Sequence, residues 1–240
     1  AIQGLSAHGP GECAVVVAVP DQYPEQFGAG SMSKPDLILI VAGGHAHACI
    51  GVIEQCGQYQ IAGLIGMQEE MHAPHLGYAV IGTDGDLPEL AKTYRYAFVA
   101  VGQIQSPDHR IRLHRQLLEL GFQLPTIVSP ISHVSRHATV GAGTIVMHGA
   151  IVNAGARLGD NCILNTRALV EHDAMVGDHC HISTGAILNG NVCVGESSYV
   201  GSGSVIKEGV VIGRGCLVGM GLSVRHDQVD RTRFVSENKT

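Results

Sequence analysis

The residues from Val134 to Val224 repeat with a period of six. Every sixth position in this range is aliphatic, and the register never slips. A repeat of fixed period decides the architecture of a chain before any local signal does, because each unit packs only on its neighbours. The sixteen positions are Val134, Val140, Val146, Val152, Leu158, Leu164, Val170, Val176, Ile182, Leu188, Val194, Val200, Ile206, Ile212, Val218 and Val224.

A six-residue period fits neither the helical period of 3.6 nor the strand period of two. It fits a coil with three flat sides, each one hexapeptide long. The residue four positions after each aliphatic is usually small, as at Ala138 and Thr144, and glycine often follows the aliphatic directly, as at Gly141. We therefore expect the aliphatic side chain to point inward and the small one to occupy a tight inner corner. Eighteen residues form one coil, so the fifteen complete hexapeptides predict five coils and a stack of roughly 25 Å.

Three short motifs within the repeat are similar to those of a known enzyme family. They are Leu164-Asn165-Thr166, Val170-Glu171-His172-Asp173 and His179-Cys180-His181-Ile182-Ser183. Together with the repeat they resemble the hexapeptide-repeat acyltransferases. Within that family they resemble the branch that contains sialic acid O-acetyltransferases and UDP-4-amino-sugar (bacillosamine-type) N-acetyltransferases. The resemblance implies a left-handed parallel β-helix, whose handedness the spacing alone cannot give.

The composition argues against other classes of partner. The net charge is −6 and no run of basic residues occurs, which disfavours nucleic acid and anionic membrane surfaces. The longest apolar run is far shorter than the ~20 residues that a membrane-spanning helix needs. We therefore expect neither a nucleic-acid nor a membrane partner.

The seven cysteines lack paired spacing, and three of them share one position of the repeat. Cys162, Cys180 and Cys216 occupy the small inner position at multiples of eighteen residues. We interpret them as small buried side chains in a reduced compartment, which predicts a cytoplasmic location. A disulfide between Cys162 and Cys180 is the alternative.

The sequence divides into four parts. We interpret residues 1–34 as a leader of natural or cloning origin, because Gly28 to Met32 reads like a linker followed by a start methionine. We expect residues 35–130 to form a Rossmann-like sugar-nucleotide-binding domain, residues 131–226 the β-helix acetyltransferase domain and residues 227–240 a polar tail. In the first domain, strands are expected at 37–42, 61–65, 79–81 and 97–101, with helices ending at Gly57 and Gly121.

The Gly43-Gly44-His45 turn follows the first expected strand and opens a helix. Free backbone N–H groups at a helix start suit a phosphate, although a Gly-Gly pair is also common in ordinary turns. In the family that the chain resembles, this turn faces the diphosphate of a nucleotide sugar. The family commonly carries acidic residues at the end of the second strand, where this chain has Gly66 and Met67. Glu69 and Glu70 follow shortly after and could substitute.

His172 is the candidate catalytic base among fourteen histidines. It lies between Glu171 and Asp173 at an outward position of the repeat. Acetyl transfer needs a base that removes a proton from the acceptor, and imidazole titrates near neutral pH. The resemblance implies that His172 is the general base and that Asp173 orients its ring. A surface histidine without function is the alternative.

The resemblance also implies three acetyl-CoA contacts, at Asn165, His181 and Gly190. Gly190 comes eighteen residues after His172, so we expect it one coil above the base on the same side. Its backbone N–H could also stabilise a developing oxyanion. His181 could instead be an ordinary polar turn residue. The C-terminal Gly-x-Pro-Ala segment typical of the family is missing, so the family pattern leaves the adenine end of the coenzyme without a matching partner.

Two other classes of β-helix protein compete with this interpretation. The γ-type carbonic anhydrases bind zinc through histidines, two of them five residues apart, but here only His109 and His114 have that spacing and they precede the repeat. We therefore expect no metal. A non-catalytic β-helix assembly scaffold would explain the repeat but not Glu171-His172-Asp173.

The sequence thus predicts an acetyl-CoA-dependent N-acetyltransferase for a nucleotide-linked amino sugar of bacterial surface glycans. O-acetylation of a sialic-type nonulosonic acid is the alternative, because one base serves both nucleophiles. The resemblance further implies a homotrimer. We expect His172 from one chain and several coenzyme contacts from the next.

Overall fold

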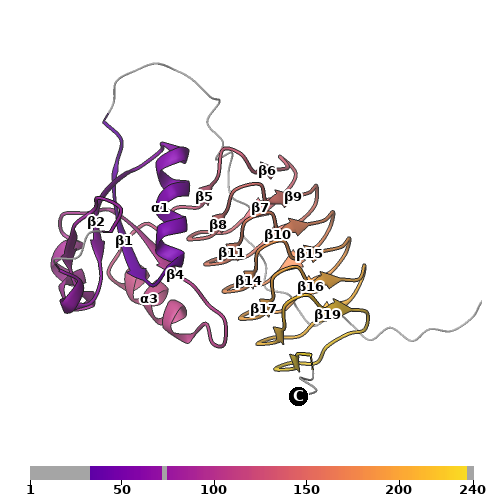
Figure 1. Ribbon diagram of the computed structural model, residues 1–240. Coiled ribbons are helices and arrows are strands. Elements are labelled where there is room, and N and C mark those ends of the chain that lie inside the picture. The colour runs from indigo at the N-terminus through magenta and orange to yellow at the C-terminus, as the bar shows by residue number, and fades with distance from the viewer. Residues whose placement is uncertain (1–32, 72–74, 237–240) are drawn as a thin grey trace, which may run out of the picture.

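The computed structural model describes residues 33–71 and 75–236 (Figure 1). The predicted leader therefore lies almost wholly outside the described residues, as does the end of the polar tail. Two domains follow each other along the chain, a small α/β domain and a stack of coils. No helix within the described ranges is long and apolar enough to cross a membrane.

The first domain contains a four-stranded parallel sheet of order β3-β2-β1-β4. Its central strand is buried from Leu37 to Val41, which explains the uninterrupted apolar run in the sequence. The predicted strands are confirmed within one residue at each end. Their bounds are β1 Asp36–Ala42, β2 Gln60–Ile65, β3 Val80–Gly82 and β4 Tyr96–Val101.

Two long helices flank this sheet. Helix α1 (His45–Cys56) ends at Gly57, whose φ of 66° lets its N–H bond to Ile53 O at 3.1 Å. Helix α3 (Asp108–Glu119) begins after Ser106, whose hydroxyl accepts the Asp108 N–H at 3.1 Å. Shorter helical segments are η1 (Gln68–Glu70), η2 (Asp84–Asp86) and α2 (Leu87–Leu90).

The second domain is a left-handed parallel β-helix, as expected. Two-residue strands stack into three parallel sheets, and every pairing joins residues eighteen apart except the last. One sheet consists of β5 (Ile127–Val128), β8 (Ile145–Val146), β11 (Ile163–Leu164), β14 (His181–Ile182), β17 (Tyr199–Val200), β20 (Leu217–Val218) and β22 (Arg233–Phe234). The second consists of β6 (His133–Val134), β9 (Ile151–Val152), β12 (Leu169–Val170), β15 (Ile187–Leu188), β18 (Val205–Ile206) and β21 (Ser223–Val224). The third consists of β7 (Thr139–Val140), β10 (Arg157–Leu158), β13 (Met175–Val176), β16 (Cys193–Val194) and β19 (Val211–Ile212).

The second residue of each strand points into the prism, and the small position of the repeat lies at its corners. Hydroxyls and thiols at that position donate to the carbonyl fifteen residues further on. Examples are Thr144 to Gly159 O at 2.8 Å and Cys162 to Gly177 O at 3.1 Å. Cys162 and Cys180 are buried free thiols, and burial raises the pKa of Cys162 to about 12. The prediction of buried inner cysteines is confirmed, and these two form no disulfide.

The β-helix is longer than the predicted range of residues 131–226 at both ends. Strand β5 lies at the end of the range expected for the first domain, residues 35–130, and one hexapeptide before Val134. Strand β22 comes from the segment expected to be a polar tail. It pairs Val218 with Phe234, sixteen residues later instead of eighteen. This shortened final coil breaks the period, which explains why the repeat signal in the sequence stops at Val224.

The α/β domain packs on the outer face of the sheet that starts with β5. Helix α1 lies between the two sheets, and its apolar residues share one core cluster with Ile127, Ile145 and Ile163 (Figure 1). Arg110 of α3 is only 1% exposed and connects the α/β domain to one corner of the β-helix coils. Its guanidinium donates to Asn161 O and to His179 O, two stacked turn residues, and to Gln103 Oε1.

Candidate functional site

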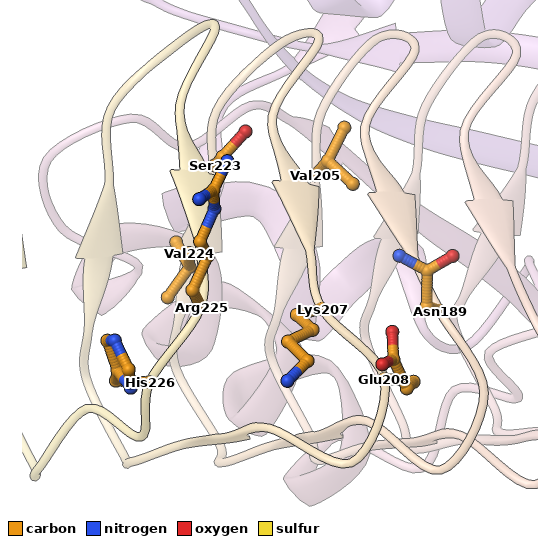
Figure 2. A pocket seen from close by; sticks show the side chains of 8 residues that line it. All are labelled: Asn189, Val205, Lys207, Glu208, Ser223, Val224, Arg225 and His226. Carbon is orange, nitrogen blue, oxygen red and sulfur yellow. The ribbon is translucent and has the colours of Figure 1, made fainter.

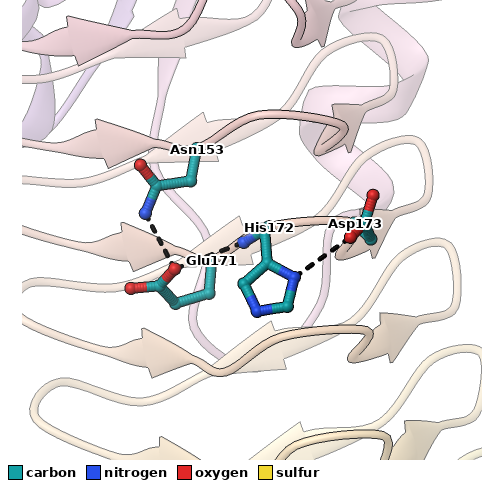
Figure 3. Close-up of polar contacts among 4 residues, drawn as sticks. All are labelled: Asn153, Glu171, His172 and Asp173. Atoms are coloured by element: carbon teal, nitrogen blue, oxygen red, sulfur yellow. Dashed lines mark hydrogen bonds and ion pairs between the residues drawn. The ribbon is translucent and has the colours of Figure 1, made fainter.

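The turn of residues 171–173, between β12 and β13, holds the predicted base. His172 is exposed, and its Nδ1 lies 3.0 Å from Asp173 Oδ2 (Figure 3). Because a carboxylate only accepts hydrogen bonds, Nδ1 carries the proton and Nε2 keeps a free lone pair. The structure therefore brings together the two residues predicted to form the catalytic pair, in an arrangement that suits a general base.

The neighbouring coils hold this turn in place from both sides. The Asp173 N–H donates to Ala154 O at 3.1 Å, and the Asn191 N–H donates to His172 O at 3.0 Å. A Cβ atom at Gly190 would lie 2.6 Å from Cε1 and Nε2 of His172. Gly190 thus lies beside the imidazole, one coil further along, as its spacing predicted. Both residues belong to one chain, so the base and any contact made by Gly190 come from the same subunit.

Asn165 and His181 form a second group, at the boundary with the α/β domain. His181 Nδ1 donates to Gln103 O at 2.7 Å, so its Nε2 accepts from Asn165 Nδ2 at 3.1 Å. Asn165 Oδ1 in turn accepts the Thr166 N–H at 2.8 Å. These contacts fix the Asn165 amide and leave one of its N–H groups for a ligand.

His181 lies in strand β14 and is only 6% exposed, not in a solvated turn. Burial lowers its pKa to about 3, so the ring is neutral. Because Gln103 and Asn165 engage both ring nitrogens, His181 can act on a ligand only through Asn165 or through packing. Its predicted coenzyme contact stays a prediction.

The Gly43-Gly44-His45 turn meets the β-helix at this same boundary. The ring centroids of His45 and His181 are 6.1 Å apart, and burial, assisted by the Arg110 charge, lowers the pKa of His45 to about 4. A Cβ atom at Gly43 or Gly44 would meet nothing within 4 Å, so the backbone at the start of α1 faces open space. A ligand could approach these N–H groups closely.

Glu70 places an acidic group near the end of β2. Its Oε2 accepts the Met67 N–H at 2.8 Å and lies 2.6 Å from where a Cβ of Gly66 would be. The carboxylate thus lies over Gly66, the residue that directly follows β2. Two turns of the α/β domain therefore offer polar groups beyond the carboxyl ends of its strands.

A pocket of about 500 Å³ begins one coil beyond His172, on the sheet that contains β15, β18 and β21 (Figure 2). Asn189, Lys207 and Arg225 stack in it at intervals of eighteen residues, in the same column as Glu171. Lys207 and Arg225 make it cationic, with Glu208 and His226 at the same end of the strands. This pocket was not predicted from the sequence, although the eighteen-residue spacing of its polar residues is a signal that could have revealed it. No group of three or more metal-ligating side chains gathers within the described residues.

Comparison with known proteins agrees with this arrangement. Residues 36–117 match the model of the PglD N-terminal domain. The structure resembles perosamine N-acetyltransferase from Caulobacter crescentus, solved in complex with CoA and GDP-perosamine. The two chains share 33% identity over 84% of this chain and 93% of the other, with a TM-score of 0.77. The chain belongs to the hexapeptide-repeat sugar acetyltransferases.

Two further structures extend the comparison. The acetyltransferase domain of PglB from Neisseria gonorrhoeae, in complex with acetyl coenzyme A, is 32% identical to this sugar acetyltransferase. That match covers 82% of this chain and 94% of the other, with a TM-score of 0.75. WeeI from Acinetobacter baumannii is 21% identical over 82% of this chain and 94% of its own, with a TM-score of 0.68, and supports the fold alone. No curated protein sequence matches the chain.

Proposed function

We propose that this sugar acetyltransferase transfers the acetyl group of acetyl-CoA to the amine of a nucleotide-linked amino sugar. The observation that carries the proposal is the His172–Asp173 pair, which presents a free Nε2 next to Gly190, one coil before a cationic pocket. Relatives of about one-third identity bind acetyl-CoA, or CoA together with GDP-perosamine. Such a product fits bacterial surface glycan synthesis, and use of acetyl-CoA fits a cytoplasmic enzyme.

In this mechanism His172 removes a proton from the acceptor amine. The amine nitrogen attacks the thioester carbonyl carbon, the C–N bond forms, and the C–S bond then breaks. The proton on Nε2 passes to the departing thiolate, which leaves as a free thiol, so no acyl-enzyme is needed. Asp173 accepts from Nδ1–H throughout and stabilises the imidazolium.

The two ends of the site would hold the two substrates. Lys207 and Arg225 supply positive charge for the phosphates of the coenzyme. Gly190 lies beside the base, nearer the acetyl group, and Asn165, before β12, keeps one amide N–H for a ligand. Gly43, Gly44 and His45 would hold the diphosphate of the acceptor through the N–H groups at the start of α1. Glu70, above Gly66, is placed to accept hydrogen bonds from a nucleoside.

A homotrimer is part of this proposal. The outward side chains of the sheet next to the catalytic turn form an apolar column of Ile151, Leu169, Ile187 and Val205, and Ile151 is 39% exposed. A second subunit packed on this column would close one side of the pocket. The site would then lie between two subunits.

The test is a product analysis by mass spectrometry. Acetyl-CoA is supplied with UDP- and GDP-linked amino sugars and, separately, with sialic acids. We expect an N-acetylated sugar nucleotide and a turnover that falls by about 10²–10⁴-fold in His172→Ala, the contribution of a general base. An O-acetylated sialic acid would favour the alternative acceptor, and full turnover in His172→Ala would remove His172 from the mechanism.

A further inference from the structure

The catalytic turn rests on the turn of the coil before it, residues 153–155. Each of these three residues makes a different contact with the catalytic turn. Asn153 Nδ2 donates to Glu171 Oε2 at 2.8 Å, and Ala154 O accepts the Asp173 N–H at 3.1 Å. A Cβ atom at Gly155 would lie 2.3 Å from Asp173 Oδ1. The lower turn therefore shapes the space in which the catalytic side chains lie.

Gly155 leaves room for the Asp173 carboxylate. Since Oδ1 occupies the space that a side chain at position 155 would fill, the carboxylate can lie against the lower turn. In this position its other oxygen, Oδ2, reaches His172 Nδ1 at 3.0 Å. Gly185, Gly203 and Gly209 have nearly the same positive φ, between 65° and 70°, but nothing lies within 4 Å of their missing side chains. Conformation alone explains those three glycines, whereas Gly155 is also required by the carboxylate above it.

Asn153 fixes the acidic residue on the other side of the base. Glu171 Oε2 accepts from Asn153 and from the His172 N–H at 3.3 Å (Figure 3). A carboxylate held in this way stays at the His172 backbone. Without Asn153, it would be free to compete with Asp173 for the proton on Nδ1.

We propose that Gly155 and Asn153 are positioning residues that set the tautomer and orientation of His172. Gly155 acts through the Asp173 carboxylate and Asn153 acts through Glu171. The catalytic consequence of this inference rests on the proposed function, but the tautomer of the ring does not. The two can therefore be tested separately.

The first test compares Gly155→Ala with Gly203→Ala in the full-length protein. Both substitutions place alanine on a left-handed backbone and impose the same strain. Only the first pushes a carboxylate away from His172. The readout is the ¹⁵N spectrum of the His172 ring, assigned by its loss in His172→Ala. We expect Gly155→Ala to lose the pure Nδ1–H tautomer and Gly203→Ala to keep it.

Activity supplies the second readout. Gly155→Ala should lower kcat at least tenfold in the wild-type background but less than twofold in an Asp173→Ala background, because its effect passes through that carboxylate. An unchanged tautomer together with a kcat no lower than that of Gly203→Ala would overturn the inference. A changed tautomer combined with full turnover in His172→Ala would support the positioning and overturn the proposed function.

Asn153→Ala provides a route that needs no strained backbone, in case Gly155→Ala does not fold. Its matched control is Ser135→Ala, which lies one coil further from the catalytic turn in the same column. We expect Asn153→Ala to lower kcat about three- to tenfold and to mix the His172 tautomers, while Ser135→Ala changes neither. Equal values in the two variants would overturn the role of Asn153.

Discussion

Single residues with a left-handed backbone shape the turns of this β-helix, and Asp173 is one of them. Its φ is 58°, a conformation in which aspartate and asparagine are several-fold enriched among residues other than glycine. The left-handed turn directs its carboxylate to His172 and down onto Gly155. Asparagine at this position would therefore keep the backbone and change only the charge.

We predict that Asp173→Asn lowers turnover less than His172→Ala does. The amide oxygen can still accept from Nδ1–H, whereas the negative charge that stabilises the imidazolium is lost. A loss of about ten- to a hundredfold in kcat is expected, below the full contribution of a general base. Steady-state kinetics of both variants would measure these losses in kcat, after thermal unfolding has shown that both are as stable as the wild type. A loss as large as that of His172→Ala would mean a more direct role for Asp173.

At the residue scale, the sequence predicted what the period controls. The position of Gly190 beside His172 followed from a spacing of eighteen. The burial of His181 could not be predicted in this way, because its partner Gln103 lies 78 residues away in the other domain. Only the packing of the two domains brings these residues together.

At the scale of elements, helix α1 joins the two halves of the proposed site. Its N-terminus is open at Gly44, while its body fills the space between the sheets. Local signals predicted both of its ends, since a glycine turn precedes it and Gly57 stops it. They could not predict that its apolar face also contacts the β-helix, because amphipathicity shows only that a face is buried.

We predict that Gly44→Val raises the KM for the sugar nucleotide about tenfold or more. Gly44 has a right-handed backbone and free space around it, so valine fits the fold but blocks close approach of a diphosphate. The matched control is Gly51→Val in the same helix, where a Cβ also meets nothing. Kinetics should show an unchanged KM for acetyl-CoA in both variants. An unchanged acceptor KM in Gly44→Val would mean that the acceptor binds elsewhere.

At the scale of the whole molecule, the boundary between the domains is a buried cationic and histidine-rich layer. It holds Arg110 with His45, His114, His179 and His181, and the acidic groups that act on it are Asp178 and Glu196. Burial, followed by the charges of His179 and Arg110, lowers the pKa of His114 to about 4. A proton added here would place a second positive charge next to Arg110.

We predict that this layer makes the protein acid-sensitive. The folded-state pKa values of His45, His114 and His181 lie near 3 to 4, below the ordinary 6.5, so the unfolded chain binds protons first. Their contribution to stability is complete above pH 6.5. It falls by about 1.4 kcal/mol per pH unit and group as pH drops from 6.5 to the folded values, below which it is lost.

Urea unfolding between pH 7.5 and 4.5 would measure this loss. His114→Gln removes one of the titrating groups and should reduce the slope of stability against pH. His109→Gln on the same helix is the control, because His109 is exposed and should leave the slope unchanged. Equal slopes in the wild type and in His114→Gln would contradict the prediction.

The proposed trimer can be tested at the same scale. Ile187→Asp places a charge in the apolar column beside the catalytic turn, and we expect light scattering to show dissociation to monomers with reduced activity. Val211→Asp introduces the same charge on the third sheet, whose outward column includes Arg157. That control should remain a trimer. A fully active monomeric wild type would refute the shared site.

The stacking of coils of equal length also sets fixed distances along the axis of the β-helix. Four residues eighteen apart lie on successive coils: Glu171, Asn189, Lys207 and Arg225. Arg225 therefore lies three strand spacings, about 14 Å, from the level of the base. A single extra coil inserted between Gly190 and Lys207 would move the cations away by about 4.8 Å without altering either half of the site. The distance between the base and the cations therefore changes in whole coils, by about 4.8 Å for each coil gained or lost.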